Sequence, residues 1–198
     1  MSKMLWKPSG ESVRQSNMHR FMQLVNARHH QKFDEYTPLY RWSVEHIAEF
    51  WAAMWEFAGV IHSAPYSEVA DDLTKMPGTH WFPGARLSYV ENLFRQADAG
   101  RPALVVASER ERPRAVSWAE LERDVAAAAA AFAALGVGTG DRVAGYLPNR
   151  LEAVVAFLAS AALGAVWTCA PPEFGARSVI ERFRQVEPKV LVAVDAAL

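Results

Sequence analysis

Between Gly140 and Asp195, short apolar runs alternate with longer amphipathic segments, and this alternation restricts the fold more than any other feature of the chain. Three mainly apolar runs of strand length occur at 142–147, 165–169 and 190–194. Two segments with helical spacing lie between them, at 150–163 and 176–186. Strands separated by helices of this length are joined by right-handed crossovers, so the pattern predicts a mainly parallel sheet.

A long helix is predicted immediately before the alternation. Ser117 and Glu120 have the spacing of a capping box, in which each side chain accepts from the other's backbone N–H. The residues that follow show helical spacing over 118–135, and Gly136 stands where a C-terminal glycine ends a helix. A second capping pair, Asn149 and Glu152, is expected to begin the helix at 150–163.

Two further strands are expected upstream. Residues 103–108 form a continuous apolar run, and residues 115–116 suggest a short strand after a hairpin-like turn. We therefore expect a mainly parallel sheet with flanking helices to extend from 101 to 195.

The front of the chain reads as helical. Ser16 can cap one helix, and Ser43 is placed to cap a second over 44–60. Six apolar residues recur at helical spacing in this second helix: Ile47, Phe50, Trp51, Met54, Trp55 and Ala58. After an irregular connection marked by Pro and Gly, Ser88 and Glu91 form another capping box.

The predicted fold class is therefore α/β: a helical N-terminal extension followed by the first part of a mainly parallel sheet with flanking helices. The change of rhythm near residue 100 places the domains at 1–98 and 99–198.

The composition favours a folded protein without affinity for polyanions. The hydrophobic fraction is 51% and the charged fraction 22%, so a buried core is feasible. A formal net charge of −1 gives no electrostatic basis for binding nucleic acid. The arginine-rich stretch 109–114 also contains two glutamates, a pattern typical of a solvated loop.

We expect the protein to lie in a reducing compartment and not to span a membrane. Cys169 is the one cysteine, which excludes an internal disulfide; we expect it to be buried at a strand end and inert. The N-terminus has no apolar run resembling a signal peptide, so a cytoplasmic location is expected. The uncharged run 153–172 is interrupted by Gly164 and ends at Pro171, which favours a buried helix and strand over a membrane span.

The usual signatures of catalysis are missing from the chain. The histidines show no His-x-x-x-His spacing, and no serine stands in a Gly-x-Ser-x-Gly elbow, so we assign no catalytic residue and no metal ligand. The glycines from Gly136 to Gly140 superficially resemble a phosphate loop. They follow a helix and precede a strand, whereas a phosphate loop follows a strand and opens a helix, so we interpret them as a helix stop and a turn.

The best candidate for function is the loop 170–175, APPEFG. It leaves the carboxyl end of a predicted parallel strand, the edge at which open α/β sheets bind ligands. Its position is equally consistent with a rigid crossover between strand and helix, stiffened by its prolines, that binds no ligand.

Parts of the sequence resemble the adenylate-forming acyl-CoA synthetases. GDRVAGYLPNRLEAVVAFLASAALGAV (140–166) with EPKVLV (187–192) is similar to the first α/β portion of many members. Four stretches resemble the acetoacetyl-CoA synthetases within this superfamily: SNMHRFM (16–22), LYRWSVEHIAEFWAAMWEF (39–57), HWFPGARLSYVENLF (80–94) and PPEFGARSVIERFRQVEPKVL (171–191). Acetyl-CoA synthetases, close relatives, tend to have a Phe-Gly-Gly turn where this chain has Pro171, Pro172 and Glu173.

The resemblance implies a two-step ligase that uses ATP, CoA and Mg²⁺. Acetoacetate attacks the α-phosphate of ATP to give an acyl-adenylate and pyrophosphate, and the CoA thiol then displaces AMP. By the same resemblance, Pro171, Pro172 and Glu173 lie where a turn of the acetyl-CoA relatives approaches CoA.

The family's phosphate-binding loop, its ribose-binding aspartate and its catalytic lysine have no counterpart here, although Pro188-Lys189 superficially resembles the end of that loop. We therefore expect an N-terminal fragment that binds none of the cofactors tightly and is inactive alone. The expected partner is the remainder of the synthetase. Without it, exposed apolar surfaces near 190–192 should cause self-association.

Two other readings remain open. One is a fragment of an acetyl- or propionyl-CoA synthetase. The other is a free-standing, non-catalytic binding module. The nucleotide sequence downstream of Leu198 would distinguish the module from a fragment.

Overall fold

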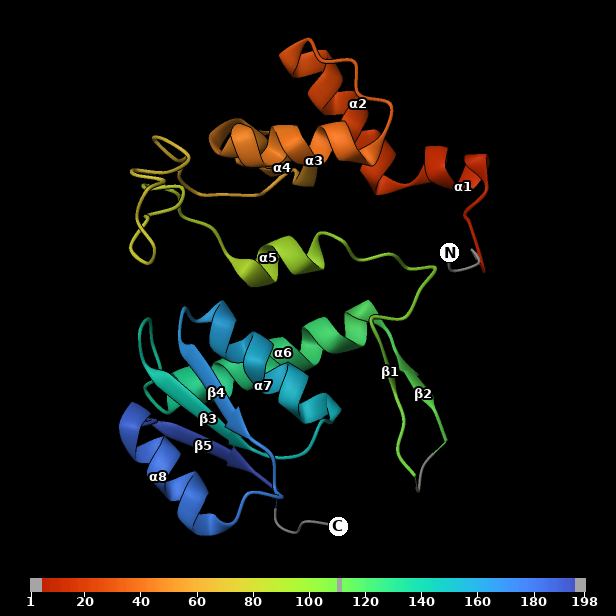
Figure 1. The fold of residues 1–198 in the computed structure, drawn as a ribbon. Helices are drawn as coiled ribbons and strands as arrows, with labels where there is room; N and C mark the ends of the chain where they lie inside the picture. The colour runs from red at the N-terminus through yellow and green to blue at the C-terminus, as the bar shows by residue number, and fades with distance from the viewer. Residues whose placement is uncertain (1–4, 110–111, 195–198) are drawn as a thin grey trace. The chain divides into compact units, whose positions relative to one another are not determined.

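The structure, a computed structural model, describes residues 5–109 and 112–194 (Figure 1). The chain divides between Arg86 and Leu87 into two compact units, each described here by itself. The domain boundary expected at 98/99 stays a prediction. Asp195 and the pair at 110 and 111, which entered the sequence-based expectations, lie outside the described residues.

The first unit contains the helices α1 (Gly10–Gln15), α2 (Asn17–His29), α3 (Tyr36–Glu45) and α4 (Ile47–Ala58). As predicted, Ser16 caps α2: its hydroxyl accepts from the His19 backbone N–H at 3.2 Å. The helix ends at His29, and the capping residue His30 has a left-handed φ of 54°. The hydrophobic core of this first unit comprises Phe21, Met22, Val25, Leu39, Trp42 and Ala53.

The predicted start of the second helix is wrong. Ser43 lies inside α3, where its hydroxyl donates to the Tyr40 carbonyl at 2.7 Å instead of capping a new helix. Leu39 and Trp42 are buried, and their packing stabilises a helix that already begins at Tyr36, upstream of Ser43. The chain then breaks at His46 and resumes as α4.

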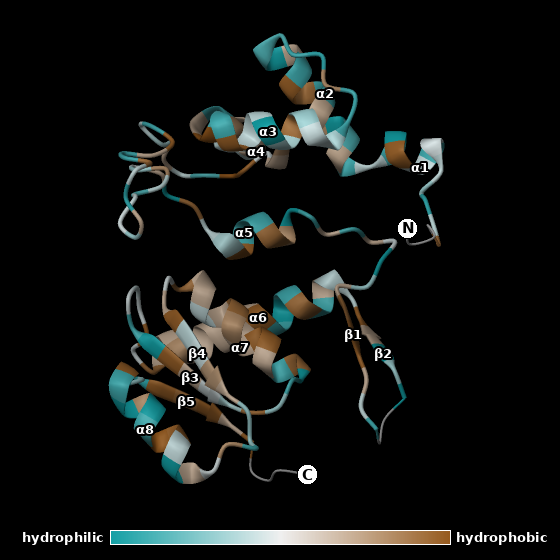
Figure 2. Cartoon of the chain, viewed as in Figure 1, coloured by the Kyte–Doolittle hydropathy of each residue, from teal (hydrophilic) through white to brown (hydrophobic). Residues whose placement is uncertain are grey.

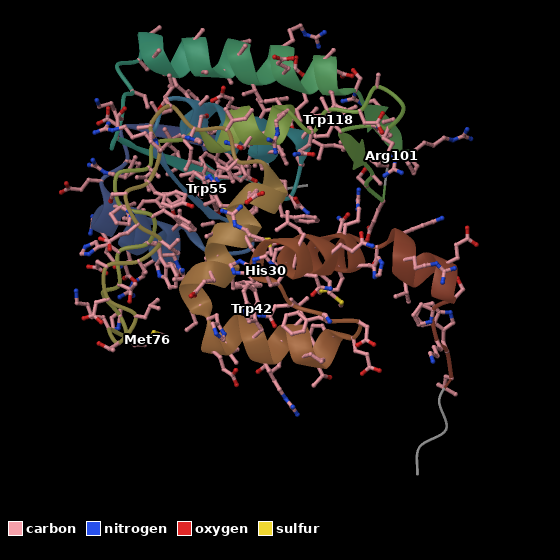
Figure 3. The ribbon with its side chains drawn as sticks, turned by 90° about the horizontal axis from the view of Figure 1, so that it is seen from above. His30, Trp42, Trp55, Met76, Arg101 and Trp118 are labelled. Atoms are coloured by element: carbon pink, nitrogen blue, oxygen red, sulfur yellow. The ribbon has the colours of Figure 1, made fainter. Side chains whose placement is uncertain are left out.

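An irregular segment follows α4, as the Pro and Gly content predicts. Phe82 lies 4.8 Å from Trp55 and 5.2 Å from Tyr66 between ring centroids, so this segment packs on α4 by its aromatic rings. Met76, which is 96% exposed, lies on the outer side of the segment (Figure 3). The Asp71 carboxylate accepts from the side chain and backbone of His80, which hold the pKa of Asp71 well below its usual range.

The second unit contains a helix, a hairpin and an α/β layer. Its elements are α5 (Tyr89–Phe94), β1 (Leu104–Val106), β2 (Arg114–Val116), α6 (Trp118–Ala134), β3 (Arg142–Tyr146), α7 (Leu151–Ala162), β4 (Val166–Ala170), α8 (Ala176–Val186) and β5 (Val190–Ala193). The strands β4, β3 and β5 form a parallel sheet in that order (Figure 1). The predicted α/β class is confirmed.

The predicted extent of the parallel sheet is wrong at its start. β1 and β2 pair antiparallel in a separate two-stranded sheet, and the parallel sheet begins at β3. Val105 in the middle of β1 is 64% exposed, so the apolar run does not form a strand buried on both faces. The antiparallel pairing of β1 with β2 agrees with the expected hairpin, although residues 110 and 111 of its turn lie outside the described residues.

The capping predictions have mixed outcomes. The hydroxyls of Ser88 and Ser117 accept from the backbone N–H groups of Glu91 and Glu120, at 3.2 Å and 3.1 Å. Arg150, not Asn149, occupies the N-cap of α7 and makes no side-chain capping bond. Gly136 ends α6 with a φ of 82°, as predicted.

Two core clusters stabilise this unit, and Figure 2 shows the hydrophobic residues concentrated on α6, α7 and the strands they cover. The first contains Val90, Val116, Leu121, Val125 and Leu158. The second contains Phe132, Val137, Val143, Ala156 and Ala159, with Trp167, Val190 and Val192 packed against it. The helices α6 and α7 therefore cover one face of the sheet. The run 153–172 contains the largely buried helix α7, as expected, but the strand that follows, β4, was expected to be buried and instead exposes Val166 and Cys169 at the edge of the sheet.

Gly145 marks a close approach within this face. A Cβ atom at this position would lie 2.5 Å from Cη2 of Trp167 and 2.6 Å from Cδ2 of Leu147. Because these distances are shorter than any ordinary carbon contact, the indole can cross β3 where a glycine leaves room.

None of the helices in the described parts of the chain combines the length and apolar character needed to cross a membrane.

Candidate functional site

The loop 171–175 lies at the carboxyl edge of the parallel sheet, as its sequence position predicts. β3 ends at Tyr146, β4 ends at Ala170, and α8 begins at Ala176. Between β4 and α8 the backbone N–H of Phe174 donates to the Pro171 carbonyl at 3.1 Å, which closes a four-residue turn.

The hydroxyl of Tyr146 links this turn to β3. Its Oη lies 2.9 Å from the Phe174 carbonyl oxygen and 3.1 Å from that of Pro172. A phenol has one proton, so the hydroxyl donates to one carbonyl at a time or shares its proton between them.

The guanidinium of Arg182 on α8 lies 4.8 Å from the centre of the Phe174 ring, in a cation–π contact.

The side chains of the turn are open to solvent. Pro171 and Glu173 are exposed, and Pro172 is half-buried. The turn therefore has a fixed backbone and a free outer surface. This geometry suits both a stiff crossover and a ligand-contacting turn, so proximity of Pro171, Pro172 and Glu173 to CoA stays a prediction.

The glycines from Gly136 to Gly140 lie at the opposite, amino edge of the sheet. Their backbone N–H groups are engaged within the fold: Gly136 donates to Ala133, Gly138 to the Asp141 carboxylate, and Gly140 to Gly164. N–H groups bonded in this way do not converge on an anion. The interpretation of this segment as a helix stop and turn, not a phosphate loop, is confirmed.

Lys189 is also engaged at the amino edge. Its Nζ donates to the Gly136 carbonyl and to Asp141 Oδ2, each at 2.7 Å. This ammonium, followed by the Gly138 amide, holds the pKa of Asp141 below its usual range. The superficial resemblance of Pro188-Lys189 to a phosphate-loop ending therefore has a structural explanation.

Arg142 completes this arrangement. Its Nε donates to the Val186 carbonyl at 2.7 Å and its Nη2 to the Glu187 carbonyl at 3.0 Å, which satisfies carbonyls at the C-terminus of α8. We refer to Asp141, Arg142 and Lys189 together as the amino-edge clasp. Sequence reasoning missed it; the only signal was the placement of charged residues at or directly before the starts of β3 and β5.

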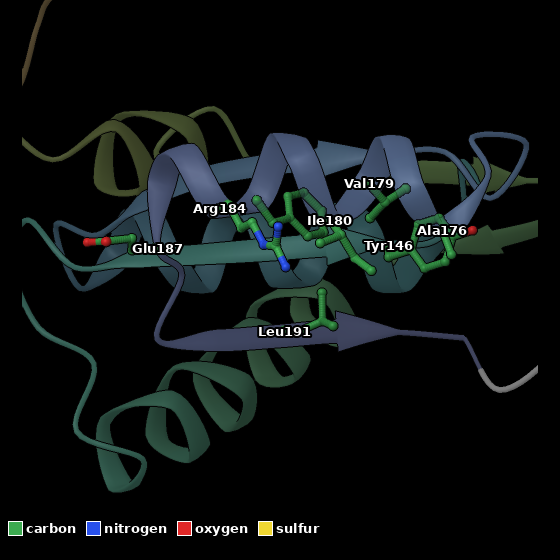
Figure 4. A pocket seen from close by; sticks show the side chains of 8 residues that line it. Tyr146, Ala176, Val179, Ile180, Arg184, Glu187 and Leu191 are labelled. Carbon is green, nitrogen blue, oxygen red and sulfur yellow. The ribbon is translucent and has the colours of Figure 1, made fainter.

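An open groove of about 580 Å³ lies beside α8, and Figure 4 shows the side chains that line it. It is lined by Tyr146, Ala176, Val179, Ile180, Phe183, Arg184, Glu187 and Leu191. The walls are mainly apolar, with one arginine and one glutamate. Tyr146 thus contributes to the groove as well as to the turn.

The sequence profile described as "AMP-binding enzyme" matches residues 93–198. The chain belongs to this family of AMP-binding enzymes. A second profile, described as "Acetyl-coenzyme A synthetase N-terminus", matches residues 36–93. The two matches follow one another along the chain, as the superfamily resemblance predicts.

Curated relatives of this AMP-binding family member support the narrower resemblance. Acetoacetyl-CoA synthetase of Danio rerio is 43% identical over 199 residues, which are 100% of this chain and 29% of that protein. The protein of the same name from Xenopus tropicalis is 41% identical over 201 residues, again 100% of this chain and 29% of its own length. The chain is therefore a homologue of acetoacetyl-CoA synthetase.

A solved structure agrees in fold. The acetoacetyl-CoA synthetase from Streptomyces lividans is 47% identical and matches 98% of this chain with a TM-score of 0.90, and the match covers 30% of that chain. The chain spans less than a third of the length of these relatives and corresponds to their N-terminal portion.

One further expectation concerns a single residue of this AMP-binding family member. Cys169 was expected to be buried, but it is exposed, because β4 is an edge strand with a neighbour on one side. Within 5–109 and 112–194, no group of three or more His, Cys, Asp or Glu residues is placed to hold a metal ion.

Proposed function

We propose that this chain contributes the N-terminal portion of an ATP-dependent acetoacetate–CoA ligase, which converts acetoacetate, ATP and CoA to acetoacetyl-CoA, AMP and diphosphate. The observation that carries the proposal is the match of 98–100% of the chain, at 41–47% identity, to proteins named acetoacetyl-CoA synthetase. The family uses ATP, CoA and Mg²⁺, and we propose the same cofactors for the complete ligase. A cytoplasmic location is part of the proposal, supported by the single cysteine.

The described residues do not fit ATP or Mg²⁺. The glycine N–H groups and the Lys189 ammonium, which would be the donors for phosphate, are bonded to the fold itself. An adenylation step needs donors aimed at the phosphates, and these groups do not supply them. We propose that the 198-residue chain alone does not form acyl-CoA.

The contribution of this chain to the ligase is positional. The Tyr146 hydroxyl fixes the backbone of the turn and leaves Pro171 and Glu173 exposed. We propose that Pro171, Pro172 and Glu173 lie close to CoA in the complete enzyme. The stiffness of the turn supports this role, because a pre-ordered surface loses little conformational entropy on binding.

The test compares two preparations. One is the purified chain; the other is the chain co-expressed with the polypeptide that follows the matched portion in the S. lividans synthetase. Each is incubated with ATP, Mg²⁺, acetoacetate and CoA, and pyrophosphate and acetoacetyl-CoA are followed. We expect no turnover above a mock purification for the chain alone, and acetoacetate-dependent turnover for the pair. Turnover by the chain alone would refute the inactivity, and turnover with acetate but not acetoacetate would refute the substrate.

Acetate is the competing substrate, because the profile that matches residues 36–93 is that of an acetyl-coenzyme A synthetase N-terminus. A propionyl-CoA synthetase portion belongs to the same alternative. A free-standing binding module is the other, and the nucleotide sequence beyond Leu198 separates it from the ligase. Continuation in frame into a phosphate-binding loop supports the ligase, and unrelated sequence after a stop codon supports the module.

A further inference from the structure

The parallel sheet has an open side at β5. In the order β4-β3-β5, this strand pairs with β3, and within the described residues no strand pairs with its other edge. The unpaired backbone groups of such an edge can accept another strand. The sequence of β5, Val190–Ala193, is apolar throughout, which is typical of a parallel strand covered on both faces.

The two faces of β5 are covered unequally. Side chains of a strand alternate between faces, and Val190 and Val192 pack with the cluster under α6 and α7. Leu191 points to the other face, where it is 55% exposed. In the described part of the chain α8 is the helix on that face, and it lies beside β3, so the sheet next to Leu191 is bare (Figure 4).

The groove is the consequence of this partial cover. Leu191 forms its strand side, and Ile180 on α8, which is 49% exposed, contributes to its helix side. Arg184 and Glu187 add one charge of each sign. A contiguous apolar surface with a polar margin is typical of a site that binds another polypeptide segment.

Resting on the proposed function, we propose that this groove and the free edge of β5 bind the part of an acetoacetyl-CoA synthetase that follows the matched portion, present as a continuation or as a separate polypeptide. Two observations favour this occupant. More than two thirds of each relative lies outside the match. The bare area also lies in the layer of α8, where an open parallel sheet places its covering helices, and the free edge of β5 is where a further strand would pair.

The experiment measures capture. The tagged chain is co-expressed with the untagged remaining polypeptide of the S. lividans synthetase, and the amount that co-purifies is measured per tagged chain. The test variants are Leu191→Asp and Ile180→Glu, which place a charge in the groove. The matched control is Leu135→Asp, because Leu135 is an exposed leucine outside the groove, 63% exposed at the end of α6.

We expect the wild type and Leu135→Asp to capture the remaining polypeptide equally, and each groove variant to capture at least about tenfold less, since burying an unpaired charge opposes association by more than the 1.4 kcal/mol that corresponds to a tenfold change. Leu191→Ala removes apolar surface without adding charge and should give an intermediate loss. It keeps the test valid if the aspartate variant fails to fold, which circular dichroism would reveal.

Capture by the wild type that is unaffected in folded groove variants would overturn the proposal, as would a remaining polypeptide that stays insoluble or unbound beside the wild type. A concentration-dependent dimer of this chain that Leu191→Asp abolishes, and that excludes the remaining polypeptide, would assign the groove to a second copy instead. Capture and catalysis are separate readouts. A complex that forms through the groove but makes no acetoacetyl-CoA contradicts the proposed function and leaves the docking surface intact.

Discussion

At the amino edge of the parallel sheet, the charged groups of Asp141, Arg142 and Lys189 are bonded to backbone atoms of the same fold, and Lys189 also to Asp141, whereas at the carboxyl edge the Tyr146 hydroxyl holds a turn and leaves Glu173 exposed. The charged groups of the first edge are already satisfied, so their contribution is to stability. The second edge keeps a fixed backbone with free side chains, which is the condition for binding a ligand. Substitutions at the two edges should therefore separate stability from function.

The largest effect is expected at Gly145, which lies on β3 between the two edges. In Gly145→Ala the new Cβ would meet Trp167 at about 2.5 Å, so the indole or the strand must shift. We expect a loss of about 1–3 kcal/mol in the free energy of unfolding, as for overpacked cores. Denaturant titration measures it. Gly175→Ala is the control, because nothing lies within 4 Å of a Cβ there; an equal loss in both variants would contradict the explanation.

The next effect is expected at the amino-edge clasp. Arg142→Met keeps most of the aliphatic stem and removes the donors to the carbonyls of Val186 and Glu187. We expect a loss of about 1–2 kcal/mol in the free energy of unfolding, because charge-assisted hydrogen bonds of a partly exposed group are lost. Hydrogen exchange should rise at the C-terminal end of α8 and stay unchanged in the turn 171–174. Increased exchange in that turn would show that the two edges are not independent.

A smaller effect on stability is expected at the carboxyl edge. Tyr146→Phe keeps the ring and removes the hydroxyl that contacts the Pro172 and Phe174 carbonyls. We expect a loss of about 0.5–1.5 kcal/mol, with faster hydrogen exchange of the Phe174 amide as the turn loosens. In the complete ligase the variant should raise the KM for CoA more than it lowers kcat. Unchanged exchange would show that the turn is fixed by other contacts.

The smallest effect is a dependence of stability on pH. The Lys189 ammonium holds the pKa of Asp141 below its usual range, so the folded state favours the carboxylate. This contribution is complete above the ordinary pKa of an aspartate and is lost as the pH falls through the lowered folded value. Asp141→Asn should weaken the loss of stability that the wild type shows as the pH falls from about 5 through the ordinary pKa of an aspartate and below it. Identical pH profiles for wild type and variant would contradict the assignment.

Local signals predicted much of the fold. Serines before amphipathic segments located the starts of α2, α5 and α6, and glycine at 136 located the end of α6, because caps are formed by residues adjacent in sequence. The same reasoning failed at Ser43, which lies inside α3, and at Asn149, which lies one residue before the N-cap of α7. The serine lies within a helix because Leu39 and Trp42, three residues apart on one face of α3, are both buried.

Features that depend on distant residues were not predictable. The apolar run containing β1 resembles a buried strand, but its pairing with β2 leaves Val105 exposed. The position of Cys169 depends on β4 being an edge strand, which periodicity does not encode. For the candidate site, the location of the turn at the carboxyl edge followed from the strand order. Its fixation by Tyr146, 26 to 28 residues away, required the structure.

Tyr146 has a consequence for communication between surfaces. Its ring lines the groove beside α8 and its hydroxyl bonds the turn at 171–174, so one rigid side chain is common to both. Any segment that binds in the groove and favours one position of the ring changes the free energy of the turn. By thermodynamic linkage the reverse holds with the same sign and magnitude, so a ligand that orders the turn would change the affinity for that segment by the same factor. Occupation of the groove and ordering of the turn are then coupled parts of a single equilibrium.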